Sequence, residues 1–225
     1  MKRFRYYLLF GFLLSQMNSS VWAQSSNHLT FETDDWRYMK LSVFSSLEHS
    51  SLTSNDSQAS DTFLSFYMNL TGIEIGTSTP FIDLMSLYYF EGSNPDFDLS
   101  KFSRDPFFEG TLIEAVRAFG ISIEQGVFPI LKEENAWKFF VNSSGTVGYS
   151  NYSGFQRRDI ARHADVERFD QRNLEFSGNI SAVADFALGK AKLRFHYAPI
   201  TIRFGWGKRS YSLATFGASL LIKIK

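Results

Sequence analysis

Residues Leu174 to Phe186 read Leu-Glu-Phe-Ser-Gly-Asn-Ile-Ser-Ala-Val-Ala-Asp-Phe and indicate the fold most clearly. Apolar and polar side chains alternate along this stretch, which is typical of a β-strand with one apolar and one polar face. We assign Leu174, Phe176, Ile180, Ala182, Ala184 and Phe186 to the apolar face, opposite Glu175, Ser177, Asn179, Ser181 and Asp185.

Seven further segments carry a related pattern, so the sequence predicts eight strands in all. Two of these segments change phase, one near Gly72 and one at Ala198-Pro199, and we expect a β-bulge at each point. On that interpretation Phe66 and Met68 share a face with Ile73 and Ile75. The seven segments are residues 36–49, 61–76, 80–91, 110–125, 136–150, 191–204 and 210–225.

The connections between these segments alternate in length. Long polar connections are expected at 50–60, 92–109 and 151–172, whereas 77–79, 188–190 and 205–209 are short and 126–135 is intermediate. Alternating short turns and long loops are typical of outer-membrane barrels. The sequence therefore predicts an all-β fold, an eight-stranded antiparallel up-and-down transmembrane β-barrel with long outer loops and short periplasmic turns.

Composition excludes several classes of protein. The chain has 225 residues, 23 Lys and Arg against 23 Asp and Glu, and no cysteine. Without cysteine there is no disulfide framework and no thiolate metal site. We find no basic stripe of the kind that binds nucleic acid, and no motif that predicts a cofactor. Aromatic residues make up 17% of the chain, which suits a barrel whose strands alternate between apolar and polar faces.

The first residues predict the compartment. Lys2, Arg3 and Arg5 precede a short apolar run, and Val21-Trp22-Ala23 supplies a cleavage site for a secretory signal peptide. We therefore expect a signal peptide at 1–23, a flexible lead at 24–35 and a barrel domain at 36–225 in the outer membrane of a Gram-negative cell. The expected partners are outer-membrane lipids, lipopolysaccharide and the barrel assembly machinery, and the expected state is a monomer.

The polar faces of the predicted strands carry charged residues that would point into the barrel. An eight-stranded barrel has room for little more than its own side chains, so we expect these residues to form a paired polar plug. A selective pore or a proton-linked site is the alternative. No spacing of histidines suggests a metal site. The expected lumen residues are Lys40, Glu48, Glu124, Lys138, Glu175, Asp185, Arg194, His196, Arg203 and Lys223.

A second group lies at the predicted outer end of the first strand, where Glu48, His49 and Ser51 stand close together. A serine, a histidine and an acid near the outer leaflet would suit an acyl-chain hydrolase. The spacing of His49 and Ser51 resembles the His-x-Ser motif of outer-membrane lipid A deacylases, in which the motif sits late in the chain. These three residues are the only catalytic candidates, and a Ser-rich loop also produces such a triplet by chance.

A third group is the charged stretch that follows the fifth segment. Its basic residues are suited to phosphates of lipopolysaccharide, although its acids nearly cancel them and a self-paired loop is the simpler expectation. A short helix around Ile160, Ala161, Ala164 and Phe169 is also compatible with the pattern. The stretch contains Arg157, Arg158, Arg162, His163, Arg168 and Arg172 among Asp159, Asp165, Glu167 and Asp170.

The segment Leu193-Arg-Phe-His-Tyr-Ala-Pro-Ile-Thr-Ile-Arg-Phe-Gly205, with the strand after it, resembles the closing hairpin of solitary autotransporter-like barrels. The resemblance implies a barrel without a passenger domain and without an established activity. Barrels of this class usually end in an aromatic residue, whereas this chain ends in Ile224-Lys225.

Three hypotheses for the function follow. The first is a non-enzymatic barrel with a structural, surface-interaction or minor permeability role. The second is the lipid A acyl-chain hydrolase that uses Glu48, His49 and Ser51. The third is a soluble periplasmic lipocalin-like binder, which would have an apolar interior and a polar exterior.

Overall fold

The computed structural model describes residues 36–51, 63–79, 82–104, 110–134, 137–157, 165–205 and 208–224, with some side chains near the strand ends left out. Nearly all of these residues lie in strands. No helix in this part of the chain is long and apolar enough to cross a membrane. The elements are β1 (Trp36–Ser51), β2 (Phe63–Thr79), β3 (Ile82–Ser93), α2 (Lys101–Arg104), β4 (Gly110–Glu134), β5 (Trp137–Arg157), β6 (Glu167–Leu188), β7 (Ala191–Gly205) and β8 (Lys208–Ile224).

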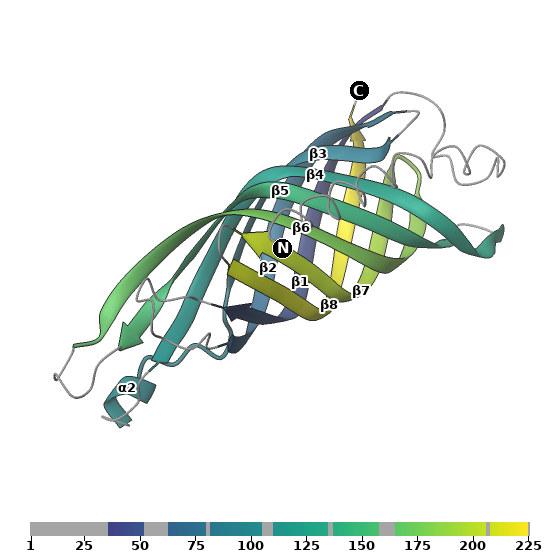
Figure 1. The fold of residues 1–225 in the computed structure, drawn as a ribbon. Coiled ribbons are helices and arrows are strands. Elements are labelled where there is room, and N and C mark those ends of the chain that lie inside the picture. Colours follow the sequence, from purple (N-terminus) through teal and green to yellow (C-terminus); the bar gives the residue numbers. More distant parts are fainter. Residues whose placement is uncertain are drawn as a thin grey trace, which may run out of the picture.

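The eight strands form one closed barrel in sequence order, and each strand pairs antiparallel with its neighbours. β1 closes the ring by pairing with β8 from Arg37↔Ile224 to Ser50↔Ser210. Closure leaves no open sheet edge, because every strand has a partner on both sides. The predicted all-β, eight-stranded up-and-down barrel is therefore confirmed, and Figure 1 shows the ring with its strands tilted across the barrel.

The phase change at Ala198-Pro199 is confirmed as a bulge. The register of β7 against β6 shifts between Asn179 and Ala182, and Pro199 and Ile200 are both exposed. β8 has a matching irregularity at Ala214, whose φ of 50° is positive, and its register against β1 shifts between Ser45 and Leu47. Since both strands carry the irregularity, the pairing of β7 with β8 remains continuous.

The bulge expected near Gly72 is wrong. The pairing of β1 with β2 is continuous from Trp36↔Ser78 to Ser51↔Phe63, so β2 keeps one phase throughout. Phe66 and Met68 are buried inside the barrel, while Ile75 is 57% exposed on its outer face. The apolar residues change side along β2 because one end of the interior is itself apolar, and the backbone does not have to shift.

Several connections are shorter than expected because the strands continue into them. β4 and β5 pair as far as Glu134↔Trp137, so the predicted turn at 126–135 is mostly strand. β5 extends to Arg157 and β6 starts at Glu167, which corrects the long loop predicted at 151–172. Phe169 lies in β6 rather than in a helix. Figure 1 shows β4, β5 and β6 reaching beyond the ring at one end, next to α2.

The lengths of the connections between strands distinguish the two ends of the barrel. We call the end that carries 52–62, 94–109 and 158–166 the long-connection end, and the other the short-turn end. α2 belongs to the long-connection end, where Asp98 accepts hydrogen bonds from the amide and hydroxyl of Ser100 at 3.0 and 2.6 Å. Arg104 pairs with the same carboxylate at 3.1 Å.

Candidate functional site

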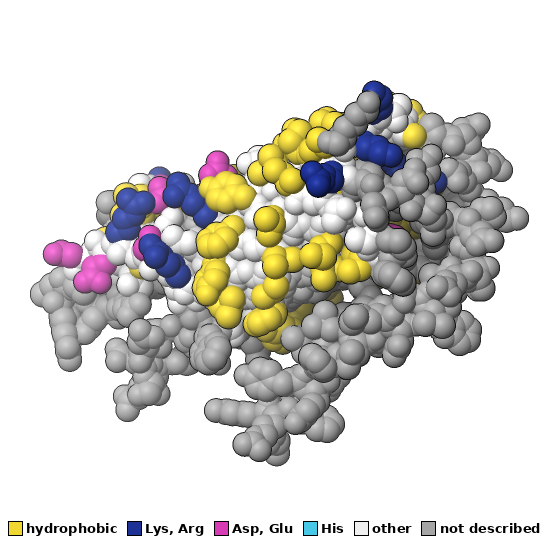
Figure 2. All heavy atoms as spheres, turned by 90° about the horizontal axis from the view of Figure 1, so that it is seen from above, with side chains coloured by type: hydrophobic (Ala, Val, Ile, Leu, Met, Phe, Trp, Pro, Cys, Tyr) yellow, Lys and Arg dark blue, Asp and Glu magenta, His cyan; other side chains and the backbone are white. Residues whose placement is uncertain are grey.

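The outer face of the barrel carries an apolar belt. We give this name to the aliphatic residues that point outward near mid-height, of which Leu87 is 67% exposed and Ile180 55% exposed. In the described strands no charged side chain interrupts these outward positions. Figure 2 shows the yellow side chains as a band, with charged side chains beyond its edges. The belt comprises Leu41, Val43, Ile75, Met85, Leu87, Ile121, Ile123, Val147, Ile180, Ile200 and Ile202.

Aromatic residues border the belt on both sides. Toward the long-connection end, Tyr89, Phe119 and Tyr149 are register partners on three neighbouring strands, and the Phe119 and Tyr149 rings stack at 5.7 Å. Toward the short-turn end, the ring of Trp137 lies 5.9 Å from Phe139 and 4.7 Å from Phe186. An apolar band between two aromatic girdles is typical of barrels that span a membrane.

The lumen is closed at the short-turn end by a small apolar cluster. Tyr38, Leu84 and Leu221 pack together there, and each is at most 1% exposed. The Phe140 ring is also buried, and the guanidinium of Arg194 lies 5.5 Å from its centroid. These side chains separate the polar interior from the nearer barrel mouth.

Above this cluster lies a charged layer with five principal members. Arg194 donates to both carboxylate oxygens of Asp185, at 2.7 and 2.8 Å, and to Glu124 at 2.8 Å. Lys40 pairs with Glu124 and, at 2.9 Å, with Glu74. Two cations thus face three carboxylates, and all five side chains are buried. Burial without pairing would be very costly for such charges, so the layer is held by its mutual contacts.

Serine hydroxyls complete the hydrogen bonding of the charged layer. Ser86 and Ser122 donate to Glu74 Oε2 at 2.9 and 3.0 Å, and their own oxygens are 2.7 Å apart. Ser42 and Ser219 are hydrogen-bonded to each other at 2.9 Å. Small hydroxyl side chains fill the space between the ions, which leaves a packed polar interior.

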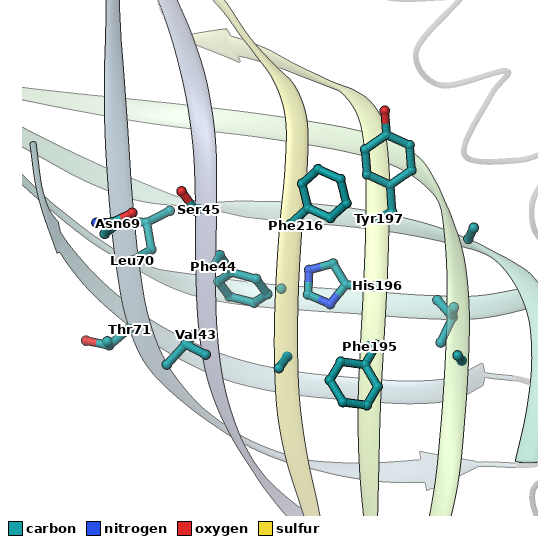
Figure 3. Close-up of a pocket in the computed structure, with 15 residues that line it drawn as sticks. Val43, Phe44, Ser45, Asn69, Leu70, Thr71, Phe195, His196, Tyr197 and Phe216 are labelled. Atoms are coloured by element: carbon teal, nitrogen blue, oxygen red, sulfur yellow. The ribbon is translucent and has the colours of Figure 1, made fainter. Parts of the chain in front are cut away.

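The next layer is made of rings. Phe44 lies 4.8 Å from His196 and 5.3 Å from Phe90, measured between ring centroids. Figure 3 shows the Phe44 and His196 rings near each other beside the strand that separates β1 from β7. That strand is β8, where a methyl group on Gly217 would overlap both rings. Glycine is therefore required at this position by the aromatic packing rather than by backbone dihedral angles.

A pocket of about 790 Å³ is bordered by this ring layer and by residues of β1, β2, β6, β7 and β8. Its lining includes Leu70, Val183 and Phe195 besides the two rings, and the described lining residues include no Lys, Arg, Asp or Glu. The pocket consequently offers no charged group for acid–base chemistry beyond the imidazole of His196.

A second ion pair lies closer to the long-connection end. Arg203 donates to the carboxylate of Glu48, which also accepts hydrogen bonds from Ser212 at 2.8 and 2.9 Å and from Ser46 at 2.5 Å. The side chains of Glu48 and Ser212 are buried. Every oxygen of this carboxylate is therefore in use within the lumen.

An apolar cluster closes the lumen at the long-connection end. Phe66, Met68, Ile113, Val116 and Tyr152 are all buried there. Leu70 and Phe169 pack against them. From one end to the other the lumen thus passes through an apolar cluster, a charged layer, a ring layer, a second ion pair and another apolar cluster.

The expected lumen residues divide into five groups. Lys40, Glu124, Asp185 and Arg194 belong to the charged layer, and Arg203 pairs with Glu48 rather than with that layer. His196 stands in the ring layer. Lys138 and Glu175 are half-buried and make other contacts, whereas Lys223 is exposed at the rim.

Sequence reasoning missed Glu74, the fifth member of the charged layer. The pattern did contain a signal, since Glu74 lies between Ile73 and Ile75 and so falls on the polar face of its strand. The two apolar clusters were also missed, because apolar residues that point inward look the same in sequence as those that point outward.

The three catalytic candidates are only partly described. The Glu48 carboxylate accepts hydrogen bonds from Arg203, Ser46 and Ser212 inside the barrel. His49 and Ser51 lie in β1, but their side chains fall outside the described residues. Among the residues that the structure covers, no group of three or more His, Asp or Glu side chains is placed to hold a metal ion.

The arginine-rich stretch is placed at the long-connection end. Arg157 donates to the carbonyl of Phe102 at 3.3 Å and lies 5.3 Å from its ring. Arg168 lies 3.7 Å from Glu114 and 6.0 Å from the centroid of the Phe155 ring. Arg172 is an exposed member of β6. The remaining basic residues of the stretch, Arg158, Arg162 and His163, lie outside the described residues.

These features define the class of protein: a closed eight-stranded β-barrel that is apolar outside, polar at mid-lumen and apolar at both ends of its lumen. The charged side chains of the charged layer are paired with one another, and Arg203 is paired with Glu48. Among the described residues there is no assembled catalytic group.

Comparison with known proteins adds two distant structural neighbours. No family model matches the chain, and no curated protein matches it. Among solved structures it is similar to Ail, the attachment invasion locus protein of Yersinia pestis, in complex with the heparin analogue sucrose octasulfate. That match has 8% identity and a TM-score of 0.39, and it covers 83% of this chain and 99% of Ail.

A second structure of Ail matches with 10% identity and a TM-score of 0.29, and covers 82% of this chain and 98% of that one. Such values are too low for either neighbour to indicate a function. The resemblance of the closing hairpin to autotransporter-like barrels stays a prediction.

Proposed function

We propose that this protein is a monomeric β-barrel of the Gram-negative outer membrane, with a closed lumen and a role in surface interaction rather than catalysis or transport. The observation that carries the proposal is the apolar belt with aromatic residues at both edges. Exposing such a belt to water would be unfavourable. A bilayer covers it at no cost in hydrogen bonds, because every strand of the closed ring is paired on both sides.

The proposal includes a route to the outer membrane and an orientation within it. A cleaved signal peptide at 1–23 would bring the chain across the inner membrane, and the barrel assembly machinery would insert it. The long-connection end would face outward, since the longer loops of such barrels are extracellular. In that orientation the extension of β4, β5 and β6 stands above the outer leaflet and presents the surface through which the protein acts.

The layered lumen supports a closed barrel over a pore. Paired charges fill its centre, and apolar clusters lie toward both ends. A water-filled path would have to cross both clusters. The facing also argues against a lipocalin-like binder, which needs its apolar surface inside and its polar surface outside.

Cell fractionation tests the membrane assignment. We expect the protein in the outer-membrane fraction, resistant to extraction by high salt and by alkaline carbonate. Recovery in the soluble periplasm would contradict the proposal and would favour the lipocalin-like alternative.

Mass spectrometry of lipid A tests the hydrolase alternative. We expect identical lipid A from cells with and without the protein, and no effect of Ser51→Ala or His49→Ala. Loss of an acyl chain that depends on Ser51 would show that the protein is an enzyme.

A further inference from the structure

A row of polar residues lies on the outer face, one step beyond the aromatic girdle toward the long-connection end. Arg117 on β4 is the register partner of Asn151 on β5, which in turn is the partner of Arg172 on β6. Adjacent strands are about 4.8 Å apart, so the two arginine backbones are separated by about 10 Å. Two guanidinium groups on long side chains can therefore reach one ligand.

The row continues the aromatic girdle directly. Phe119 lies two residues after Arg117 on β4, and Tyr149 lies two residues before Asn151 on β5. Both are on the same outer face and are 57% and 52% exposed. On β6, Arg172 is separated from Phe176 by one further outward position, Leu174. A molecule that occupies both levels meets exposed rings below and guanidinium groups above.

Both guanidinium groups are available. Arg117 and Arg172 are exposed, and among the described residues neither makes a hydrogen bond or an ion pair. Arg157 and Arg168 differ, because they are engaged with Phe102 and with Glu114 and Phe155.

Acidic neighbours flank the row without occupying it. Glu91 is the register partner of Arg117 on β3 and accepts a hydrogen bond from the Tyr89 hydroxyl at 3.1 Å. Asp170 lies two residues beyond Arg172. The position between the two arginines is held by the neutral Asn151, so an anion placed there is separated from Glu91 by Arg117.

We propose that Arg117 and Arg172 bind the phosphorylated headgroup of an outer-leaflet glycolipid whose acyl chains lie against the aromatic girdle and the apolar belt. Guanidinium groups bind phosphate oxygens through paired, charge-assisted hydrogen bonds. The inference rests on the proposed membrane location and names the partner of that surface. A lipid fits better than a free phosphate, because the row stands directly above apolar surface that only acyl chains would cover.

The test is a binding titration of the folded, full chain in detergent micelles. The probes are lipid A with both phosphates, the same lipid A after dephosphorylation, and inorganic phosphate. We expect phosphorylated lipid A to bind about tenfold more tightly than the dephosphorylated form, and Arg117→Gln and Arg172→Gln each to weaken its binding about tenfold. Binding of dephosphorylated lipid A should stay unchanged in both variants.

Arg37→Gln is the matched control, since Arg37 is an exposed arginine of β1 at the short-turn end. It should bind phosphorylated lipid A like the unaltered protein. Equal affinity for the two forms of lipid A, unaltered binding by both row variants, equal weakening by Arg37→Gln, or competition by inorganic phosphate at the concentration of lipid A would each overturn the proposal.

Two further measurements distinguish lost binding from misfolding, and failure of this inference from failure of the proposed membrane location. The heat-dependent shift in electrophoretic mobility that folded barrels show reports whether each variant is folded, and Arg117→Lys and Arg172→Lys replace any glutamine variant that does not fold. Lysine keeps the charge and loses the paired donors, so its binding should be intermediate. Outer-membrane recovery with no preference for phosphorylated lipid A would reject this inference alone, whereas recovery in the periplasm would reject the membrane location itself.

Discussion

The charges inside the barrel and those above its aromatic girdle have opposite environments. In the charged layer Arg194 makes three hydrogen bonds to two carboxylates and is 2% exposed. On the outer face Arg117 and Arg172 are exposed and make no hydrogen bond or ion pair with other described residues. An arginine side chain thus has a structural role inside the barrel and is available to a ligand on the outer face.

The difference comes from solvation. A buried ion that loses its partner is left with an uncompensated desolvation cost, so interior charges are fixed in pairs. An exposed ion is hydrated and screened, so it can exchange water for a ligand at little cost. We therefore expect substitutions inside the barrel to change its stability, and substitutions of Arg117 or Arg172 to change ligand binding.

The largest expected effect is that of Arg194→Ala, which leaves Asp185 and one oxygen of Glu124 without their cation. We expect a loss of about 3–5 kcal/mol in the free energy of unfolding. Arg168→Ala is the control, because its pair with Glu114 is 3.7 Å long and its side chain is 68% exposed. That substitution should cost about 0–1 kcal/mol. Urea titrations in lipid vesicles measure both, and equal costs would remove the distinction between the two regions.

The facing of the strands could largely be predicted from sequence. Alternation in 174–186 and 191–204 assigned Asp185, Arg194 and Arg203 to the lumen, and all three point there. A strand with one lipid-facing and one polar face has a period of two that depends only on local sequence. For the same reason the bulge at Ala198-Pro199 was visible as a change of phase.

The wrong assignment on β2 has a physical cause. Phe66 and Met68 were expected on the outer face because an outward lipid-facing set and an inward apolar cluster have the same composition. Which face is buried in protein depends on the strands opposite, here β4 and β5, which supply Ile113, Val116 and Tyr152. The partner of a buried charge also depends on residues far away in the sequence. Arg203, for example, pairs with Glu48, which is 155 positions away.

The next effect in size concerns the belt. Ile180→Arg places a charge in the apolar belt, and we expect it to cost about 2–4 kcal/mol if the proposed membrane location puts this position near the bilayer midplane. Asn179→Ala, at the neighbouring inward position, should cost less. The free energy of unfolding in vesicles is the measurement, and equal tolerance at the two positions would show that the assigned facing, or the membrane location, is wrong.

A smaller effect is expected at a glycine beside the ring layer. A methyl group on Gly72 would overlap the Phe90 ring and lie 2.7 Å from the carbonyl oxygen of Tyr89. We expect Gly72→Ala to cost about 1–3 kcal/mol through overpacking. Gly145→Ala is the control, since its added methyl meets only one oxygen at 3.6 Å. If both substitutions were neutral, the interior would be looser than the ring layer implies.

The smallest effect is local to α2. The hydroxyl and amide of Ser100, together with Arg104, hold the pKa of Asp98 below its usual value. This interaction is present above the ordinary pKa of an aspartate and is lost as the pH falls through the lowered value. Asp98→Asn should therefore leave global unfolding unchanged and increase proteolysis within 94–104 at neutral pH. Unchanged proteolysis would mean that the carboxylate does not order this connection.

A membrane-spanning barrel whose lumen is closed by its own side chains should not conduct ions, and conductance in a planar lipid bilayer can be measured on the purified protein. We expect no steady current from the purified protein, because two apolar clusters and the paired ions of Arg194 and Arg203 block a continuous water path. Stable, ion-selective channels whose selectivity changes in a folded Arg194→Ala variant would contradict this expectation and identify the protein as a pore.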